Sequence, residues 1–235
     1  MGISTNKIRY ASPNKVIDIP ADKRVFVIGD LDADYNKFLQ AIHSVSFDPH
    51  ADVLISLGDV IDRGNDSLKL LDTFSQLGVY MVLGNHEHMM LEALAKDQQA
   101  YDLWIKNGGL WHKHSDKNSL LNACNKLISC PLSILLNYQG EKIGLSHTLA
   151  TCWDWQQPMK VNAQLISDLL WNRQITQSKK LVQNLGVLFS IHGHNATAKP
   201  YWIENTYHID TNYLGGSPTI VELSELIKNF KTLIN

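Results

Sequence analysis

Short apolar runs that end in a polar turn recur along the chain. These runs cover residues 25–28, 53–57, 79–83, 143–146 and 187–191. They are rich in β-branched and aliphatic residues, and glycine follows the first three directly. Short runs of this kind, bounded by glycine, predict buried strands.

Helical periodicity fills the gaps between the first runs. Tyr35, Phe38, Leu39 and Ile42 follow the i, i+3, i+4, i+7 spacing, and Asp34 is placed to cap this helix. A second helix is predicted from Leu68, Leu71, Phe74 and Leu77, ending at Gly78. Alternation of strand and helix predicts an α/β fold with a parallel βαβ core. We also expect helix over about residues 88–127 and two late strands at 207–211 and 219–223.

Composition narrows the class of protein. The chain has 235 residues, 44% of them hydrophobic, which excludes a disordered protein. Lys and Arg number 21 against 23 Asp and Glu, so no basic excess points to nucleic acid. No repeat or Pro/Gly-rich linker marks a boundary, and we predict one catalytic domain over residues 1–235.

Cysteine usage and apolar segments indicate the compartment. Cys124, Cys130 and Cys152 form no CxxC pair, which suits a reducing environment. Residues 1–20 contain no continuous apolar core of a signal peptide, and no run approaches the ~18 residues of a membrane span. We therefore expect a cytoplasmic protein with no membrane partner.

The polar turns after the five runs carry the candidate chemistry. They contain Asp30, Asp59, Asn85, His147 and His194. In a parallel sheet, ligands bind beyond the carboxyl ends of the strands. Carboxylate, amide and imidazole donors together favour divalent Mn, Fe or Zn over a thiolate site. A carboxylate at a central strand can bridge two ions ~3.5–4 Å apart, which hold an attacking hydroxide and clamp a phosphoryl oxygen.

Two segments resemble signatures of a known family. Residues 58–64 read GDVIDRG and residues 84–87 read GNHE, which resemble the GDxxDRG and GNHE signatures of the phosphoprotein phosphatase (PPP) family of metallophosphoesterases. Segments at 107–111, 170–173, 193–200 and 209–211 are similar to the bacteriophage lambda-type and bacterial members. The resemblance implies a calcineurin-like metallophosphoesterase sandwich, in which two mixed β-sheets are flanked by helices.

The resemblance also implies a ligand set for two divalent ions. Asp30 would bind the first ion and Asp59 would bridge the pair, while Asn85, His147 and His194 would hold the second. The ions would be Mn²⁺ in the first instance, with Fe, Zn or Mg as alternatives. His192 competes with His194, because strand alternation puts both on one side, but only His194 lies in the Gly-His turn.

The same resemblance assigns the catalytic side chains. Arg63 and Arg173 would grip the non-bridging phosphate oxygens, a task that suits planar guanidinium groups. His86 would donate a proton to the leaving alkoxide, with Asp62 orienting it. The remaining histidines match no ligand position and are expected on the surface or around the site: His43, His50, His88, His112, His114 and His208.

Asp32 departs from the family pattern. The first signature of the family is GDxHG, with its histidine on the first metal, and this chain has Asp32 at that position and Ala33 at the second glycine. Three interpretations remain open: Asp32 ligates the metal as a hard anion, it binds through water, or it leaves the first site weak.

The leading hypothesis is a metal-dependent phosphatase of phosphoserine and phosphothreonine, with phosphotyrosine as an extension, in which water attacks in line. The enzyme alternative is hydrolysis of diadenosine polyphosphates or other small phosphoesters. A third hypothesis is a catalytically impaired, phosphate-binding homologue, because of Asp32. The expected partner is a phosphoprotein or a small phosphoester, and the sequence does not indicate the oligomeric state.

Overall fold

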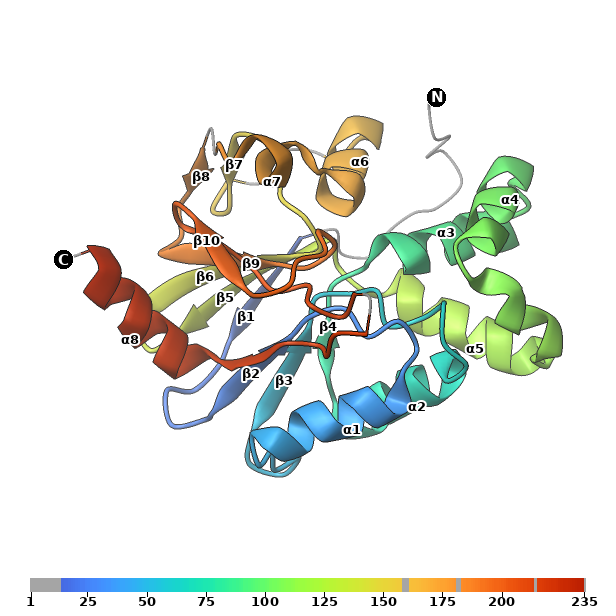
Figure 1. Ribbon diagram of the computed structural model, residues 1–235, viewed down its shortest axis with the longest axis horizontal. Coiled ribbons are helices and arrows are strands. Elements are labelled where there is room, and N and C mark those ends of the chain that lie inside the picture. Colours follow the sequence, from blue (N-terminus) through green and yellow to red (C-terminus); the bar gives the residue numbers. More distant parts are fainter. Residues whose placement is uncertain (1–13, 158–160, 181–182, 214, 235) are drawn as a thin grey trace.

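The computed structural model describes residues 14–157, 161–180, 183–213 and 215–234, and Figure 1 shows two sheets packed face to face with helices outside them. Residues 1–13, on which part of the signal-peptide expectation rests, lie outside this range.

The smaller main sheet carries the βαβ core predicted from the hydrophobic pattern. Its order is β12 (Ile220–Glu222), β2 (Val25–Ile28), β3 (Val53–Ser56) and β4 (Tyr80–Met81). β2, β3 and β4 are parallel, whereas β12 runs antiparallel to β2. Helices α1 (Tyr35–Ser44) and α2 (Ser67–Leu77) form the two crossovers.

The larger sheet is mixed and combines distant segments. Its order is β1 (Asn14–Asp18), β5 (Ser133–Tyr138), β6 (Glu141–Ser146), β9 (Phe189–His192), β11 (Thr206–His208) and β10 (Tyr201–Ile203). β1 pairs parallel to β5, and β6 pairs parallel to β9. A separate two-stranded sheet joins β7 (Trp153–Asp154) and β8 (Asn184–Leu185).

The remaining helices cover the outside of the sandwich. They are α3 (Asn85–Leu94), α4 (Gln98–Lys106), the 3₁₀ helix η1 (Gly109–His114), α5 (Lys117–Ile128), α6 (Ala163–Trp171), α7 (Gln174–Ser178) and α8 (Leu223–Ile234). In Figure 1, α3, α4 and α5 lie to one side of the sheets, and α6 and α7 lie beyond the larger sheet.

The two sheets bury one apolar layer between them. Val25 and Val27 of β2 and Ile55 of β3 pack in the same cluster as Ile143 and Leu145 of β6. The alternate residues of β2 and β3 belong to a second cluster with the apolar sides of α1 and α2. Because both faces of β2 and β3 are buried, their sequences read as continuous apolar runs rather than as alternating ones.

The predicted ends of the first two helices agree with the structure, whereas the predicted length of the strand at 79–83 does not. Asp34 accepts from Lys37 N–H at 2.9 Å and caps α1, and Gly78 ends α2 in the left-handed region at φ 64°. The predicted strand at 79–83 is only Tyr80–Met81, because the chain turns early into α3. In the described residues, no helix has the length and apolar character needed to cross a membrane.

Two histidines expected at the surface or around the site are buried in the fold. His88 and His208 are each 2% exposed. His88 lies on α3, and burial lowers its pKa to about 4.

We predict that His88 makes the fold acid-sensitive. An unfolded histidine titrates near pH ~6.5, so the unfolded chain takes up the proton before the folded chain as the pH falls. The stabilisation is complete above pH ~6.5 and is lost as the pH falls toward the folded pKa of about 4. In His88→Gln, the drop in unfolding free energy between about pH 7 and about pH 5 should shrink by about 2 kcal/mol.

Urea unfolding at the two pH values measures this difference. His50→Gln is the control, because His50 is exposed and its substitution should leave the drop unchanged. An equal drop in wild type and His88→Gln would show that His88 does not cause the acid sensitivity.

Candidate metal centre

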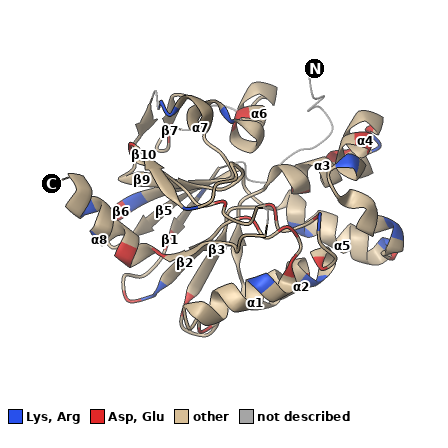
Figure 2. Ribbon diagram, in the orientation of Figure 1, with Lys and Arg blue, Asp and Glu red and all other residues tan. Residues whose placement is uncertain are grey.

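The predicted polar turns converge beyond the ends of the strands. Asp30 follows β2, Asp59 follows β3, Asn85 follows β4, His147 follows β6 and His194 follows β9. Figure 2 shows acidic residues, in red, in the loops at the centre of the view. The carboxyl ends of strands from both sheets therefore meet at one place, as the spacing of the turns predicts.

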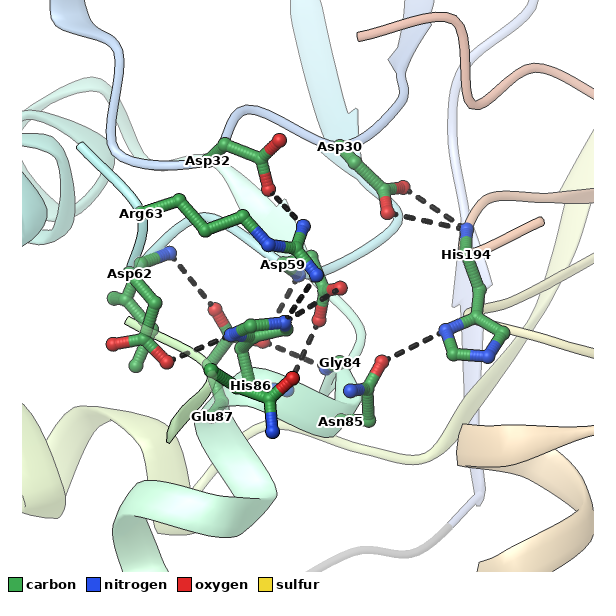
Figure 3. A network of polar contacts seen from close by, with 12 residues as sticks. Asp30, Asp32, Asp59, Asp62, Arg63, Gly84, Asn85, His86, Glu87 and His194 are labelled. Carbon is green, nitrogen blue, oxygen red and sulfur yellow. Dashed lines mark hydrogen bonds and ion pairs between the residues drawn. The ribbon is translucent and has the colours of Figure 1, made fainter. Parts of the chain in front are cut away.

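Four of the predicted side chains form a compact donor cluster. Ligand atoms of Asp59, His147 and His194 lie within 4.8 Å of one another. The Asn85 amide oxygen lies 2.9 Å from His147 Nε2 and 2.8 Å from His194 Nδ1. All four residues are buried. Figure 3 shows the Asn85 side chain directed at His194.

The orientation of His147 fits a cation in this cluster. Its Nδ1 lies 2.7 Å from the Leu57 carbonyl oxygen, an acceptor, so Nδ1 carries a proton. Its Nε2 lies 2.9 Å from Asn85 Oδ1 and 3.3 Å from Asp59 Oδ1. Burial lowers the pKa of His147, but the Asp59 carboxylate outweighs it and the pKa is raised, so a proton on Nε2 occupies the place that a cation on Asp59 would take. A backbone carbonyl on the far ring nitrogen is the usual support of a ligating histidine.

His194 is also suited to be a ligand. Burial and the neighbouring His147 lower its pKa to about 2, so it is a neutral imidazole. His192 does not join the cluster: its Nε2 lies 2.7 Å from Ser190 Oγ and its Nδ1 3.2 Å from Ser146 Oγ. The structure thus brings His194, and not His192, to the predicted position.

Asp30 lies beside the cluster in an acidic environment. Both of its carboxylate oxygens accept from the His194 backbone N–H at 3.2 Å. Burial and the carboxylates of Asp210 and Asp59 raise its pKa well above the usual value. Gly193 is a glycine for a steric reason, because a Cβ there would collide with Asp30 Oδ1.

Asp210 also belongs to this acidic group, although the strand pattern of the sequence does not place it there. Burial and the carboxylates of Asp59 and Asp32 raise its pKa to about 6. The strand expected at residues 207–211 is shorter in the structure: β11 ends at His208, so Asp210 lies in the turn that follows. The signal was available, since the residue two positions after a strand end is also acidic at Asp30.

The Glu87 carboxylate joins the turn after β3 to the start of α3. Its Oε2 accepts from the N–H groups of Asp59 and Gly84, each at 2.9 Å. Its Oε1 accepts from Val60 at 2.8 Å and Ile61 at 3.2 Å. Burial and the Asp59 carboxylate raise the pKa of Glu87 to about 7, and a cation on Asp59 would remove the second of these causes.

His86 is oriented by a buried carboxylate. Its Nδ1 lies 2.7 Å from Asp62 Oδ2, and Asp62 also accepts from the indole N–H groups of Trp104 at 3.0 Å and Trp111 at 2.6 Å. Burial lowers the pKa of His86, but the carboxylates of Asp59 and Asp62 outweigh it and the pKa is raised. The two tryptophans therefore hold Asp62 in place.

The segment at residues 107–111 supports the turn of Arg63. Gly108 has φ 112°, and a Cβ there would lie 2.5 Å from the Arg63 backbone nitrogen. A Cβ on Gly109 would lie 2.5 Å from the ring of Trp104. Only glycine permits this approach, which places η1 against the Arg63 turn and sends Trp111 to Asp62.

The predicted arginines border a cleft over the cluster. Arg63 and Arg173 line a cleft of about 790 Å³ together with Asp30, Asp59 and Asn85. The Arg63 guanidinium pairs with the Asp32 carboxylate, as Figure 3 shows, and its Nη2 lies 2.7 Å from His86 Nε2. The prediction that Asp32 ligates a metal ion stays a prediction.

The backbone of the site is strained. Non-glycine residues with left-handed φ angles include Asp32 (51°), Ala33 (55°), Asp59 (51°), Asp62 (72°), Arg63 (64°) and His194 (62°). Such angles cost roughly 1–2 kcal/mol per residue and persist where the surroundings impose them. Ala33 stands where the family has glycine, and its φ shows why glycine suits this position.

A family model described as calcineurin-like phosphoesterase matches residues 23–216. The chain is 28% identical to serine/threonine-protein phosphatase 1 of Salmonella typhimurium over 210 residues, which covers 86% of this chain and 92% of that protein. It is 32% identical to the symmetrical bis(5'-nucleosyl)-tetraphosphatase of Buchnera aphidicola over 178 residues, which covers 66% of this chain and 58% of that protein.

Among solved structures, the chain is similar to one described as a putative diadenosine tetraphosphatase. The TM-score is 0.62 at 18% identity, and the match covers 88% of this chain and 97% of that one. At this identity the similarity concerns the fold, and it confirms the predicted sandwich of two mixed sheets.

We predict that Glu87→Gln destabilises the fold by about 2–4 kcal/mol, because the amide NH₂ replaces an acceptor and leaves buried backbone N–H groups without partners. Urea unfolding of the metal-free protein measures the loss directly. Glu225→Gln, an exposed substitution on α8, is the matched control and should change stability by less than about 0.5 kcal/mol. Equal stability of the two variants would contradict a central role for the Glu87 carboxylate.

Proposed function

The chain belongs to the calcineurin-like phosphoesterase family, and we propose that it is a divalent-metal-dependent phosphomonoesterase that removes phosphate from phosphoserine and phosphothreonine in proteins. Phosphotyrosine is an extension of this substrate range. We further propose a cytoplasmic location, which the three free cysteines support.

The observation that carries the proposal is the position of one donor cluster next to one oriented histidine. Asp59 belongs to the cluster with His147 and His194, and its Oδ2 lies 3.9 Å from His86 Nε2. A site with metal ligands on one side and an imidazole on the other can act on both ends of a phosphoester bond.

We propose that two divalent ions bind here, with Mn²⁺ first because the donors are carboxylate, amide and imidazole. Asp30 and Asp59 would hold the first ion, and Asp59 with Asn85, His147 and His194 would hold the second. When bound, such ions polarise a phosphoryl oxygen and activate water for attack.

The chain's own side chains then bind the phosphate and move a proton. Arg63 and Arg173 border the cleft and would bind the non-bridging oxygens. His86 Nδ1–H donates a hydrogen bond to Asp62, which leaves Nε2 to carry the mobile proton. This proton can pass from Nε2 to the leaving oxygen as the bond between phosphorus and that oxygen breaks. Water supplies the new oxygen on phosphorus, and phosphate and the free hydroxyl are the products.

A second candidate function is hydrolysis of dinucleoside polyphosphates. It is supported by the identity to the Buchnera tetraphosphatase, but the chain covers only 58% of that protein. The match to the Salmonella phosphatase covers 92% of that protein. This difference in coverage is our reason for putting the protein phosphatase activity first.

We predict that Asp59→Asn abolishes hydrolysis, because it removes the charged donor shared by the cluster. The measurements are Mn²⁺-dependent phosphate release from p-nitrophenyl phosphate and phosphoserine peptides and, in parallel, nucleotide release from diadenosine tetraphosphate. The control is Asp72→Asn, an exposed substitution with the same charge change. Full activity of Asp59→Asn would refute the site assignment, and turnover of the dinucleotide alone would favour the second candidate.

We predict that His86→Asn slows hydrolysis of a phosphoserine peptide by about 10²–10⁴-fold. The loss with p-nitrophenyl phosphate should be far smaller, because p-nitrophenolate is a weak base that leaves without protonation. The ratio of kcat values for the two substrates measures the effect. Equal losses with both substrates would show that His86 is not the proton donor.

A further inference from the structure

Arg63 is shared between two side chains of the site. Its guanidinium pairs through Nη1 with the Asp32 carboxylate and approaches His86 Nε2 to 2.7 Å through Nη2. Figure 3 shows Arg63 extended between them. The Arg63 side chain is 49% exposed, whereas Asp32 is 19% exposed. The pair thus lies at the wall of the cleft, with the carboxylate the more buried partner.

The backbone builds this pairing into the fold. Asp32 N–H donates to the Asp59 carbonyl oxygen at 3.1 Å, which ties the turn after β2 to the turn that leads to Arg63. A Cβ on Gly64, the residue after Arg63, would lie 2.6 Å from the Asp32 carbonyl oxygen. The two turns are therefore in direct backbone contact, and their left-handed residues fix the directions of both side chains.

The chemistry of the pair matches that of the substrate. A guanidinium binds a carboxylate and a phosphate through the same planar donors. In the described part of the chain, the hydrogen bond to the Asp32 carboxylate comes from Arg63. The contacts of the Asp32 carboxylate are those of a partner of the arginine.

We propose that Asp32 is a positioning residue that competes with phosphate for Arg63. The proposal rests on the proposed function, because Arg63 matters only if a phosphoryl group binds in this cleft. An incoming phosphoryl group displaces the Asp32 carboxylate from the guanidinium, and Asp32 recaptures Arg63 as inorganic phosphate leaves. The same displacement draws Arg63 away from His86 Nε2, the atom that faces the leaving group.

The test is binding of inorganic phosphate to the Mn²⁺-loaded protein by calorimetry at fixed ionic strength. Asp32→Asn should tighten phosphate binding about three- to tenfold, the range expected for releasing a partly exposed ion pair. In the Arg63→Gln background, the same Asp32→Asn change should alter the affinity by less than about twofold, because the competition is gone. Asp72→Asn should bind phosphate as the wild type does.

Three results would overturn the proposal. Tightening of the same size with and without Arg63 would show that Asp32 acts through its charge on the whole cleft. Loss of one bound Mn²⁺ in Asp32→Asn, counted by electron paramagnetic resonance, would make Asp32 a metal ligand instead. An unchanged affinity in Asp32→Asn would also refute it. Failure of the proposed function has a different signature: no wild-type turnover, with the phosphate-binding cycle still measurable.

Discussion

The buried Glu87 carboxylate is the interaction on which the geometry of the site depends. It takes four backbone N–H groups, three from the turn after β3 and one from Gly84 at the start of α3. A Cβ on Gly58 would lie 2.5 Å from Gly84 nitrogen, so the two turns are also in van der Waals contact. Asp59 and Asn85 belong to these two turns, so the Glu87 carboxylate holds them close together.

The same close contact places a helix N-terminus at the charged centre. His86 N–H donates to Asp59 Oδ1 at 3.1 Å, within the first turn of α3. The positive end of the helix dipole stabilises an anion there. Burial opposes this, but the imidazoles of His147 and His86 hold the pKa of Asp59 below its usual range. The bridging candidate is thus a preformed carboxylate, and the strain at Asp59, Asp62 and Arg63 maintains its surroundings.

The features that could be predicted are those that depend on residues close together in the sequence. The cap at Asp34 and the left-handed stop at Gly78 depend on a few neighbouring residues, and both were predicted. The parallel pairing of β1 with β5 joins segments more than a hundred residues apart, and no pattern in residues 14–18 indicates it. The burial of His88 was missed for the same reason. Glu87 was visible in the signature, but three of its four backbone donors come from the turn after β3, which only the fold brings near.

Charge balance explains why Asp32 has an arginine beside it. Asp30, Asp32, Asp59 and Asp210 line one cleft, and two divalent ions would neutralise only these four carboxylates. Attraction for a phosphate dianion then depends on the cations Arg63, Arg173 and Lys179, which line the same cleft. While Asp32 holds Arg63, one of these three charges is already matched. The nearly neutral net charge of −2 therefore conceals a cleft that is lined by four carboxylates. In this cleft, the substrate phosphate meets the full charge of Arg63 only after it has replaced the Asp32 carboxylate.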